Sequence, residues 1–274
     1  MLLFLIFCTI GYAIKMKYAD CVDENRTWVI ERHPIFKNRV AVIHRYRETP
    51  GERAESFSHI FKDHVWGKES AVESNSGVYR RSGPGSTLLA ASAATTAVVT
   101  IVKKLAKATP RVVIVDVPCG DMTWMNKSLF LLDQLNVPFL YFGFDIVDAV
   151  VAQNRRLFSQ HKNWHFGRID LVQEFPFVPV PVDLFLTRQM TQHLYTADAL
   201  SAFEHIFSHR PPPKFLLATT FPHHNDNQEL TGKIYRYRRQ NLELPPFSFS
   251  APECIVRDCC DENSIFMGLW NLKP

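Results

Sequence analysis

The sequence is short of glycine, of net charge and of long apolar runs, and each shortage excludes a class of protein. Glycine accounts for 11 of 274 residues, against a usual share of about 7%, which excludes a collagen-like or low-complexity chain. Lysine and arginine exceed aspartate and glutamate by 31 − 27 = 4, an excess too small to make nucleic acid the default partner. With 46% hydrophobic and 21% charged residues, the chain is not expected to be mainly disordered. Its length of 274 residues predicts one large domain or two small ones.

The six cysteines identify neither a metal site nor a compartment. No CxxC pair with zinc-like partners occurs, so we expect no metal site. Cys119 is expected to be a buried thiol. The others that remain after residue 13 could form disulfides in an oxidising compartment, in a pairing that the sequence does not select; they are Cys21, Cys254, Cys259 and Cys260.

The chain begins with an apolar segment that is too short for a comfortable membrane span. Leu2 to Ile10 is almost entirely apolar and is followed by Gly11-Tyr12-Ala13, whereas a span needs about 20 residues. Such a segment is typical of a secretory signal, although no basic residue precedes it. We expect residues 1–13 to be a signal peptide or short anchor that leads into the secretory pathway. The alternative is a buried N-terminal element of a cytoplasmic protein.

Residues 14–85 are mixed and polar, and we expect them to be an irregular N-terminal extension that covers a pocket in the main domain, residues 86–274. Glu48 to Ser58 is interpreted as an ordinary solvated stretch. Gly83-Pro84-Gly85 cannot continue a helix and predicts a turn. Ser86 is then a candidate N-cap for an apolar helix over 87–106.

From residue 111 onward, short apolar strands alternate with helices. We expect strands at 112–115, 139–144, 164–169, 182–187 and 214–219, and helices at 124–135, 146–158 and 197–209. The alternation predicts an α/β fold with a mostly parallel central sheet and helices on both faces. Tyr235 to Arg239 interleaves tyrosine and arginine. We interpret it as a surface strand with inward tyrosines, the alternative being a site for RNA or an anionic sugar.

Acidic residues fall at the ends of three successive expected strands. Asp116 and Asp121 flank the turn after the first strand, Asp145 ends the second, and Asp170 ends the third. In open parallel sheets, ligands bind beyond the carboxyl ends of the strands. Asp145 lies 145 − 120 = 25 residues after Gly120, where an acid can accept hydrogen bonds from two ribose hydroxyls. The set therefore predicts a nucleoside cofactor.

The first turn differs from a phosphate-binding loop. Pro118 and Met122 stand where two glycines of GxGxxG would be, and Asp121 places negative charge where a pyrophosphate would lie. These differences argue against NAD and against a triphosphate. They favour a cationic cofactor without phosphate, such as S-adenosyl-L-methionine with its sulfonium.

Two motifs and many smaller segments resemble one family. Val112 to Met125 resembles the first motif of class I S-adenosylmethionine-dependent methyltransferases, especially a subgroup with a DxPCGDxxWM turn. Tyr141 to Val147 resembles the YxGxDIV second motif of that subgroup. Smaller counterparts extend the resemblance from Phe57 to the C-terminus. It implies the Rossmann-like fold of class I methyltransferases.

The resemblance also implies roles for individual residues. Asp145 would hold the ribose, Ile146 would pack on adenine, and Asp170 would face the adenine amino group. Other residues would line the methionine part of the cofactor or close the pocket; these are Asp116, Pro118, Cys119, Gly120, Asp121, Trp124, Gly85 and Ser86. Gln189 stands where the subgroup usually has aspartate, which suggests a changed substrate or reduced activity.

Methyl transfer to a hydroxyl or an amine also requires a group that takes up a proton. His193 follows the fourth expected strand, and His223 and His224 follow the fifth; histidine titrates in the useful range. Arg188 would bind an acidic substrate group or pair with a cofactor-site acid. We therefore expect O-methylation of a glycan or small molecule. The alternatives are a catalytically weak binding protein of this fold, and a protein or nucleic-acid methyltransferase.

Overall fold

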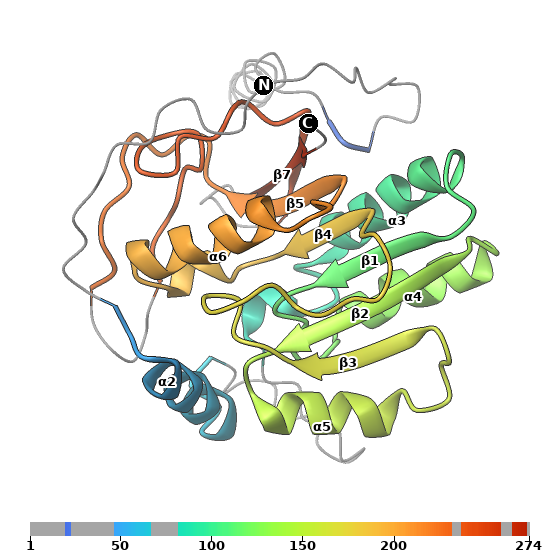
Figure 1. Ribbon diagram of the computed structural model, residues 1–274, viewed down its shortest axis with the longest axis horizontal. Coiled ribbons are helices and arrows are strands. Elements are labelled where there is room, and N and C mark those ends of the chain that lie inside the picture. Colours follow the sequence, from blue (N-terminus) through green and yellow to red (C-terminus); the bar gives the residue numbers. More distant parts are fainter. Residues whose placement is uncertain (1–19, 23–46, 67–81, 232–236, 259–264, 273–274) are drawn as a thin grey trace, which may run out of the picture.

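Short runs of β-branched and aromatic residues form a seven-stranded sheet in the order β3-β2-β1-β4-β5-β7-β6 (Figure 1). The computed structural model describes residues 20–22, 47–66, 82–231, 237–258 and 265–272. β1 to β5 run parallel, and β7 is antiparallel to both β5 and β6. The strands are β1 (Val112–Asp116), β2 (Phe139–Asp145), β3 (Trp164–Arg168), β4 (Leu184–Thr187), β5 (Phe215–Thr220), β6 (Cys254–Arg257) and β7 (Phe266–Asn271). The mostly parallel α/β sheet predicted from the sequence is confirmed.

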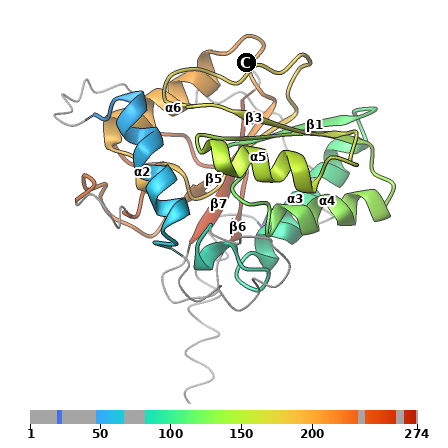
Figure 2. The same ribbon diagram turned by 90° about the horizontal axis from the view of Figure 1, so that it is seen from below.

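Helices cover both faces of this sheet, as predicted. α3 (Ser92–Ala106) and α4 (Met125–Gln134) pack on one face, and α6 (Thr196–Ser208) packs on the other. α5 (Asp148–Leu157) runs along β3 at one edge (Figures 1 and 2). Every residue of β1, β4 and β5 is buried, which is why these strands contain almost no polar residues and show no alternation.

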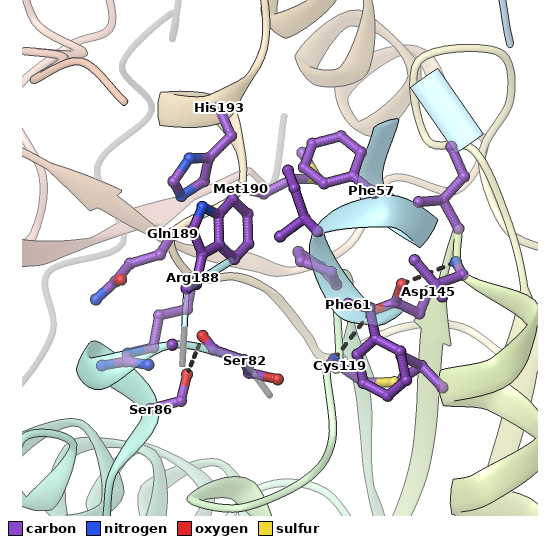
Figure 3. Close-up of a pocket in the computed structure, with 18 of the residues that line it drawn as sticks. Phe57, Phe61, Ser82, Ser86, Cys119, Asp145, Arg188, Gln189, Met190 and His193 are labelled. Carbon is purple, nitrogen blue, oxygen red and sulfur yellow. Dashed lines mark hydrogen bonds between the residues drawn. The ribbon is translucent and has the colours of Figure 1, made fainter. Parts of the chain in front are cut away.

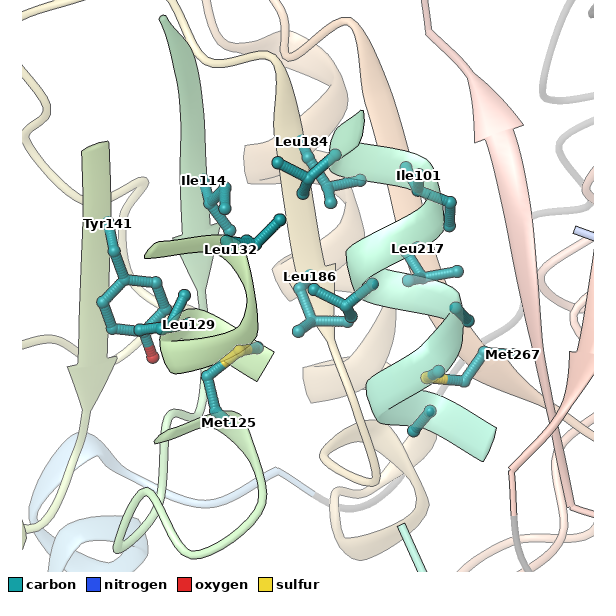
Figure 4. Close-up of a cluster of buried hydrophobic side chains, with 14 of the residues drawn as sticks. Ile101, Ile114, Met125, Leu129, Leu132, Tyr141, Leu184, Leu186, Leu217 and Met267 are labelled. Atoms are coloured by element: carbon teal, nitrogen blue, oxygen red, sulfur yellow. The ribbon is translucent and has the colours of Figure 1, made fainter. Parts of the chain in front are cut away.

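The core consists of two apolar layers, one on each side of the sheet. On the side of α3 and α4, Leu129 and Leu132 lie against Ile114, and Ile101 lies near Leu217 (Figure 4). Residues on the α6 side form a second cluster, which includes Phe185, Phe203 and Ile206. Each such side chain contributes about 1.5–3 kcal/mol when it leaves water. Successive residues of β1 belong to opposite layers, because side chains alternate along a strand.

Part of the N-terminal extension is a helix, which corrects the expectation of an irregular, solvated stretch. α2 (Pro50–Lys62) begins with a capping box, in which Thr49 Oγ1 accepts from the Glu52 N–H (3.2 Å) and Glu52 accepts from the Thr49 N–H (2.8 Å). Pro50 occupies the first turn, where its missing N–H costs nothing. The capping box and Pro50 therefore indicate the start of a helix, which the polar composition of this stretch does not reveal.

The helix expected from residue 87 begins later than predicted. α3 starts at Ser92, and Ser86 lies in a short 3-10 helix, η2 (Pro84–Ser86), rather than at an N-cap. Thr87 Oγ1 accepts from the Ala90 N–H (3.2 Å) and closes a separate turn. This turn leaves Leu88 and Leu89 exposed, whereas Ala90 and Ala91 are buried just before α3 begins.

The C-terminal strands β6 and β7 were not predicted. β6 is joined to the start of the chain by a disulfide between Cys21 and Cys254, and the Cys21 N–H donates to the Ile255 carbonyl (3.1 Å). Disulfides persist mainly in oxidising compartments. Cys119 is a buried free thiol, as expected. The expected signal at 1–13 and the remaining two cysteines, Cys259 and Cys260, lie outside the described residues.

The expected surface strand with inward tyrosines at 235–239 is also corrected. Residues 235 and 236 lie outside the described residues, and 237–239 form no strand. Tyr237 is exposed, whereas Arg238 is buried and donates to the carbonyls of Leu194 (2.8 Å) and Gln228 (2.9 Å). Burial lowers the pKa of Arg238 to about 10. Arg238 is thus committed to the protein interior rather than to RNA.

Neither a membrane-spanning helix nor a metal site is found in the part of the chain that the structure describes. No helix there is long and apolar enough to cross a membrane. No group of histidine, cysteine and acidic side chains there is arranged to hold a metal ion.

Candidate functional site

A cavity of about 770 Å³ lies at the carboxyl ends of the parallel strands. It is lined by the turn after β1, by the first residues after β2 and β4, and by side chains of α2, as the close-up in Figure 3 shows. This volume lies within the range for small-molecule sites and is large enough for a nucleoside together with a second small molecule. The edge of the sheet at which ligands were expected to bind therefore does carry a cavity of suitable size.

At position 120, in the turn after β1, both the backbone conformation and the available space require glycine. Its φ is +55°, and a Cβ placed there would come within 2.6 Å of Ser82 Oγ. Its N–H donates to Asp145 Oδ2 (3.1 Å), and its carbonyl accepts from the Asn154 side chain (2.8 Å). The turn is thus held at a fixed distance from β2, with its backbone on the cavity.

Asp121 joins this turn to the loop at 82–86. Its Oδ2 accepts from the Ser82 N–H (3.0 Å), and its own N–H donates to Ser82 Oγ (3.0 Å). Gly85, Ser86, Pro118, Cys119 and Trp124 also line the cavity. Asp121 is buried at its edge, so the negative charge expected from the sequence does lie beside the ligand space.

Asp145 lies at the end of β2 and on the cavity wall. Its Oδ1 accepts from the Val147 N–H (3.0 Å), in addition to the bond from Gly120. Burial raises the pKa of Asp145 from 3.8 to about 6, while the backbone hydrogen bonds oppose this rise. Ile146 lines the cavity next to it and packs with Phe61 of α2.

Asp116 is not among the described residues that line the cavity. Alternation along β1 turns its side chain toward α4, where Asp116 Oδ2 accepts from the Tyr141 hydroxyl (2.8 Å). Burial raises its pKa from 3.8 to about 8, so the carboxyl group is protonated at neutral pH. Because the folded state holds this proton more tightly than the unfolded state, Asp116 favours folding less as the pH rises from about 4 to about 8.

Asp170 reaches the cavity together with an arginine that the sequence analysis did not select. Arg53 of α2 is buried, and its Nε donates to Asp170 Oδ2 (3.0 Å) while its Nη1 donates to Asp198 Oδ2 (2.8 Å). Arg53 Nη2 is also buried and has no hydrogen-bond partner among the described residues. These ion pairs join α2 to Asp170, after β3, and to Asp198 of α6, and so hold α2 beside the cavity.

Arg188 pairs with an acid, but with Asp258 rather than with one of the expected cofactor acids. Its Nε donates to Asp258 Oδ1 (2.8 Å), and its Nη2 donates to the Gly85 carbonyl (2.6 Å). Its guanidinium also lies 4.9 Å from the centre of the Trp124 ring. Gln189 Nε2 donates to the same Asp258 (3.3 Å), so an aspartate at 189 would face another carboxylate. Arg188 therefore holds the loop at 82–86 in place.

The structure separates the three candidate histidines. His193, in the 3-10 helix η3 (Thr191–His193), lines the cavity, and its ring centre lies 4.5 Å from that of Trp66. His223 is exposed and does not belong to the described lining of the cavity. The same holds for His224, which is half-buried. Among these residues, His193 alone is placed to meet a ligand in the cavity.

The sequence analysis missed the contributions of α2 and of the C-terminal segment. Arg53, Phe57 and Phe61 follow one another at helical spacing and face the cavity. The motif Thr-x-x-Glu before them is a capping box, which was the available signal. Asp258 and Ile265 carried no such signal: they lie between β6 and β7, and the partners of Asp258, Arg188 and Gln189, are about 70 residues away in the chain.

Comparisons with known proteins give similarity in structure alone. No family model matches the chain, and no curated protein matches its sequence. Magnesium protoporphyrin IX methyltransferase from Synechocystis, with bound SAM, aligns with a TM-score of 0.50 at 13% identity, over 83% of this chain and 98% of that one. A protein from Pyrococcus horikoshii aligns with a TM-score of 0.47 at 17% identity, over 71% of this chain and 98% of its own.

One similar structure belongs to a longer chain. The present chain spans 35% of the solved chain of a citrinin polyketide synthase CMeT domain, with a TM-score of 0.39, 18% identity and 51% of its own length covered. The strand order, the antiparallel β7 and the alignment with the Synechocystis enzyme agree on the architecture. The chain has the Rossmann-like fold of class I methyltransferases.

Proposed function

We propose that the protein is an S-adenosyl-L-methionine-dependent methyltransferase that acts on a hydroxyl group of a small molecule or glycan. The observation that carries this proposal is the position of Asp145, on the cavity wall at the end of β2 and bonded to the Gly120 N–H. In α/β nucleotide-binding folds, a carboxylate at this point accepts hydrogen bonds from the ribose. The fold shared with methyltransferases supports the same assignment.

The residues around Asp145 fit a nucleoside that carries no phosphate. Asp121 is buried beside the turn, where it would repel a pyrophosphate and favour a cation. Ile146 and Phe61 offer apolar surfaces to an adenine ring. Arg53 Nη2, buried without a partner next to Asp170, would give a ring nitrogen a donor at the same end of the cavity.

When bound, S-adenosyl-L-methionine supplies a methyl group on a positively charged sulfur, which an acceptor oxygen takes up as the neutral thioether leaves. The chain then has to hold the acceptor, exclude water and receive the proton of the hydroxyl. His193 lies on the cavity wall after β4 and is proposed to receive this proton. Arg188 and Asp258 would act indirectly, because they hold the loop that closes the cofactor end.

Replacement of Asp145 by alanine tests the cofactor assignment. The variant should bind S-adenosyl-L-methionine about 1.5–3 kcal/mol more weakly by calorimetry, because two charge-assisted hydrogen bonds are lost. The affinity of the wild-type protein should fall as the pH is lowered through about 6, where Asp145 takes up a proton. Asp145→Asn should remove this pH dependence, since the amide does not titrate in that range.

A matched control is Asp148→Asn, three residues further along the chain, where the side chain is exposed on α5. This variant should bind the cofactor like the wild type. Equal affinity of wild type and Asp145→Ala, or tight binding of NAD by the wild type, would remove the assignment.

A second candidate function is a binding protein that uses this fold without transferring a methyl group. Gln189 favours it, because an amide stands where the resembling subgroup usually has a carboxylate. Its side chain is committed to Asp258 (3.3 Å), so position 189 offers no base. Both candidates predict cofactor binding, and methyl transfer distinguishes them.

We further propose that the protein works in the secretory pathway, where glycans and small hydroxylated compounds are available acceptors. The apolar start of the sequence and the Cys21–Cys254 disulfide support this location. Expression in animal cells with a C-terminal tag tests it. A product in the cytosol that retains residues 1–13 and shows no shift with glycosidase would contradict the location and leave the cofactor site unaffected.

A further inference from the structure

Four rings form an aromatic wall at the β4 end of the cavity: Phe57, Trp66, His193 and Tyr237. Neighbouring ring centres lie 6.2 Å apart for Phe57 and Trp66, 4.5 Å for Trp66 and His193, and 5.6 Å for His193 and Tyr237. The rings come from α2, from the turn after it, from η3 and from the segment that begins at 237. Tertiary structure therefore brings together separate parts of the chain to build this surface.

Trp66, His193 and Tyr237 lie away from the proposed cofactor end, whereas Phe57 also packs with Phe61 beside it. Along the sheet edge, Asp170 follows β3, Asp145 ends β2, Gly120 follows β1, and His193 follows β4. Figure 3 shows His193 and Gln189 on the opposite side of the cavity from Asp145 and Cys119. A ligand on the aromatic wall would thus lie beside a nucleoside bound at Asp145 rather than in its place.

The chemistry of the two ends differs. Among the described residues that line the cavity, the carboxylates are Asp121, Asp145 and Asp170, all at the cofactor end. Besides its rings, this part of the lining includes the apolar side chains of Met190, Leu194 and Ile265. Its polar residues are Gln189, whose side chain is bonded to Asp258, and Arg239, two residues after Tyr237. A buried sugar would need a polar partner for each hydroxyl, and a cationic amine would need a carboxylate. Flat aromatic rings, in contrast, stack favourably on other aromatic rings.

We propose that the acceptor is a small phenol, whose ring packs against the aromatic wall at Trp66 and Tyr237 and whose hydroxyl faces His193. This inference rests on the proposed methyltransferase function and names the substrate class for it. A phenolic hydroxyl has a pKa of about 10, much nearer to the range of histidine than the pKa of water or of a sugar hydroxyl. The proton of a phenol therefore passes to a histidine more readily than that of a sugar.

Equilibrium binding of naphthol to the full chain tests the proposal without relying on turnover. Its saturated analogue decahydronaphthol has the same carbon skeleton but no flat ring, and methyl glucoside represents a glycan unit. Calorimetry is carried out with and without the product S-adenosylhomocysteine. Naphthol should bind about tenfold more tightly than decahydronaphthol, and methyl glucoside should bind most weakly. Equal affinities for naphthol and decahydronaphthol, or a higher affinity for methyl glucoside than for naphthol, would overturn the proposal.

Variants of the aromatic wall separate stacking from general hydrophobicity. Trp66→Leu and Tyr237→Leu should each lower the affinity for naphthol about 2- to 10-fold, with unchanged affinity for S-adenosylhomocysteine. Tyr237 is 45% exposed, so its replacement leaves the core intact. Phe177→Leu is the control, since Phe177 is 86% exposed and lies outside the described lining of the cavity.

The two proposals fail in different ways. If S-adenosylhomocysteine does not bind, the proposed function fails, whatever naphthol does. If S-adenosylhomocysteine binds but naphthol does not, or if the Trp66 and Tyr237 variants bind naphthol like the wild type, the assignment of the aromatic wall alone is wrong.

Discussion

Replacing His193 by alanine should lower turnover about 10²–10⁴-fold with nearly unchanged affinity for S-adenosyl-L-methionine. The two effects separate because His193 follows β4, on the far side of the cavity from Asp145 (Figure 3). Removing the ring also removes a contact with Trp66, so a loss of packing has to be distinguished from a loss of proton transfer. Turnover measured with and without added imidazole makes this distinction, since a soluble base restores proton transfer but not the fixed position of the ring.

His223→Ala is the matched control for this experiment, because His223 is exposed and does not belong to the described lining of the cavity. It should keep the turnover of the wild type. A His193→Ala protein that turns over at the full rate would show either that another histidine takes the proton or that the reaction needs no base.

Replacing Arg53 by methionine should lower the free energy of unfolding by about 3–5 kcal/mol. The side chain is 1% exposed and bonds both Asp170 and Asp198. Its loss leaves the carboxylate of Asp198, which is itself 2% exposed, buried without this positive partner. Affinity for the cofactor should also fall, because α2 carries Phe57 and Phe61 on the cavity wall. Urea unfolding and calorimetry measure the two effects.

Glu55→Met controls for the introduction of methionine into the same helix, since Glu55 is exposed. It should change the unfolding free energy by less than about 0.5 kcal/mol. Arg53→Lys, which keeps the charge but loses the planar fork, should lie between wild type and Arg53→Met. An Arg53→Met protein as stable as Glu55→Met would contradict the account of how α2 is held.

The parallel half of the fold was predictable, and the antiparallel end was not. Helices separate β1 from β2, β2 from β3 and β4 from β5, and strands that alternate with helices in this way usually form a parallel sheet. β6 and β7 follow each other without a helix between them, so Cys254–Arg257 and Phe266–Asn271 carried no comparable signal. The start of α3 was misplaced because Ser86 looked like an N-cap while the 3-10 turn at Pro84–Ser86 already used it.

The candidate site, like the fold, was predictable only in part. Residues next to strand ends, such as Gly120, Asp145 and His193, could be chosen from the sequence because topology alone brings strand ends together. The face on which a side chain lies was harder to foresee, and Asp116 points into the core with Tyr141. Arg188 pairs with Asp258, 70 residues away in the chain, and Asp170 pairs with Arg53, 117 residues away. Ion pairs between such distant residues produce no local sequence pattern.

The central claim is that the protein transfers a methyl group to an acceptor bound in this cavity. The most direct test is to measure transfer of labelled methyl from S-adenosyl-L-methionine into the fractions of a lysate. The wild-type protein should label a small-molecule or glycan fraction, and the Asp145→Ala protein at equal concentration should label it far less. Tight cofactor binding by calorimetry without transfer of label into any small-molecule, glycan, lipid, protein or RNA fraction would contradict the claim and identify the protein as a binding protein of this fold.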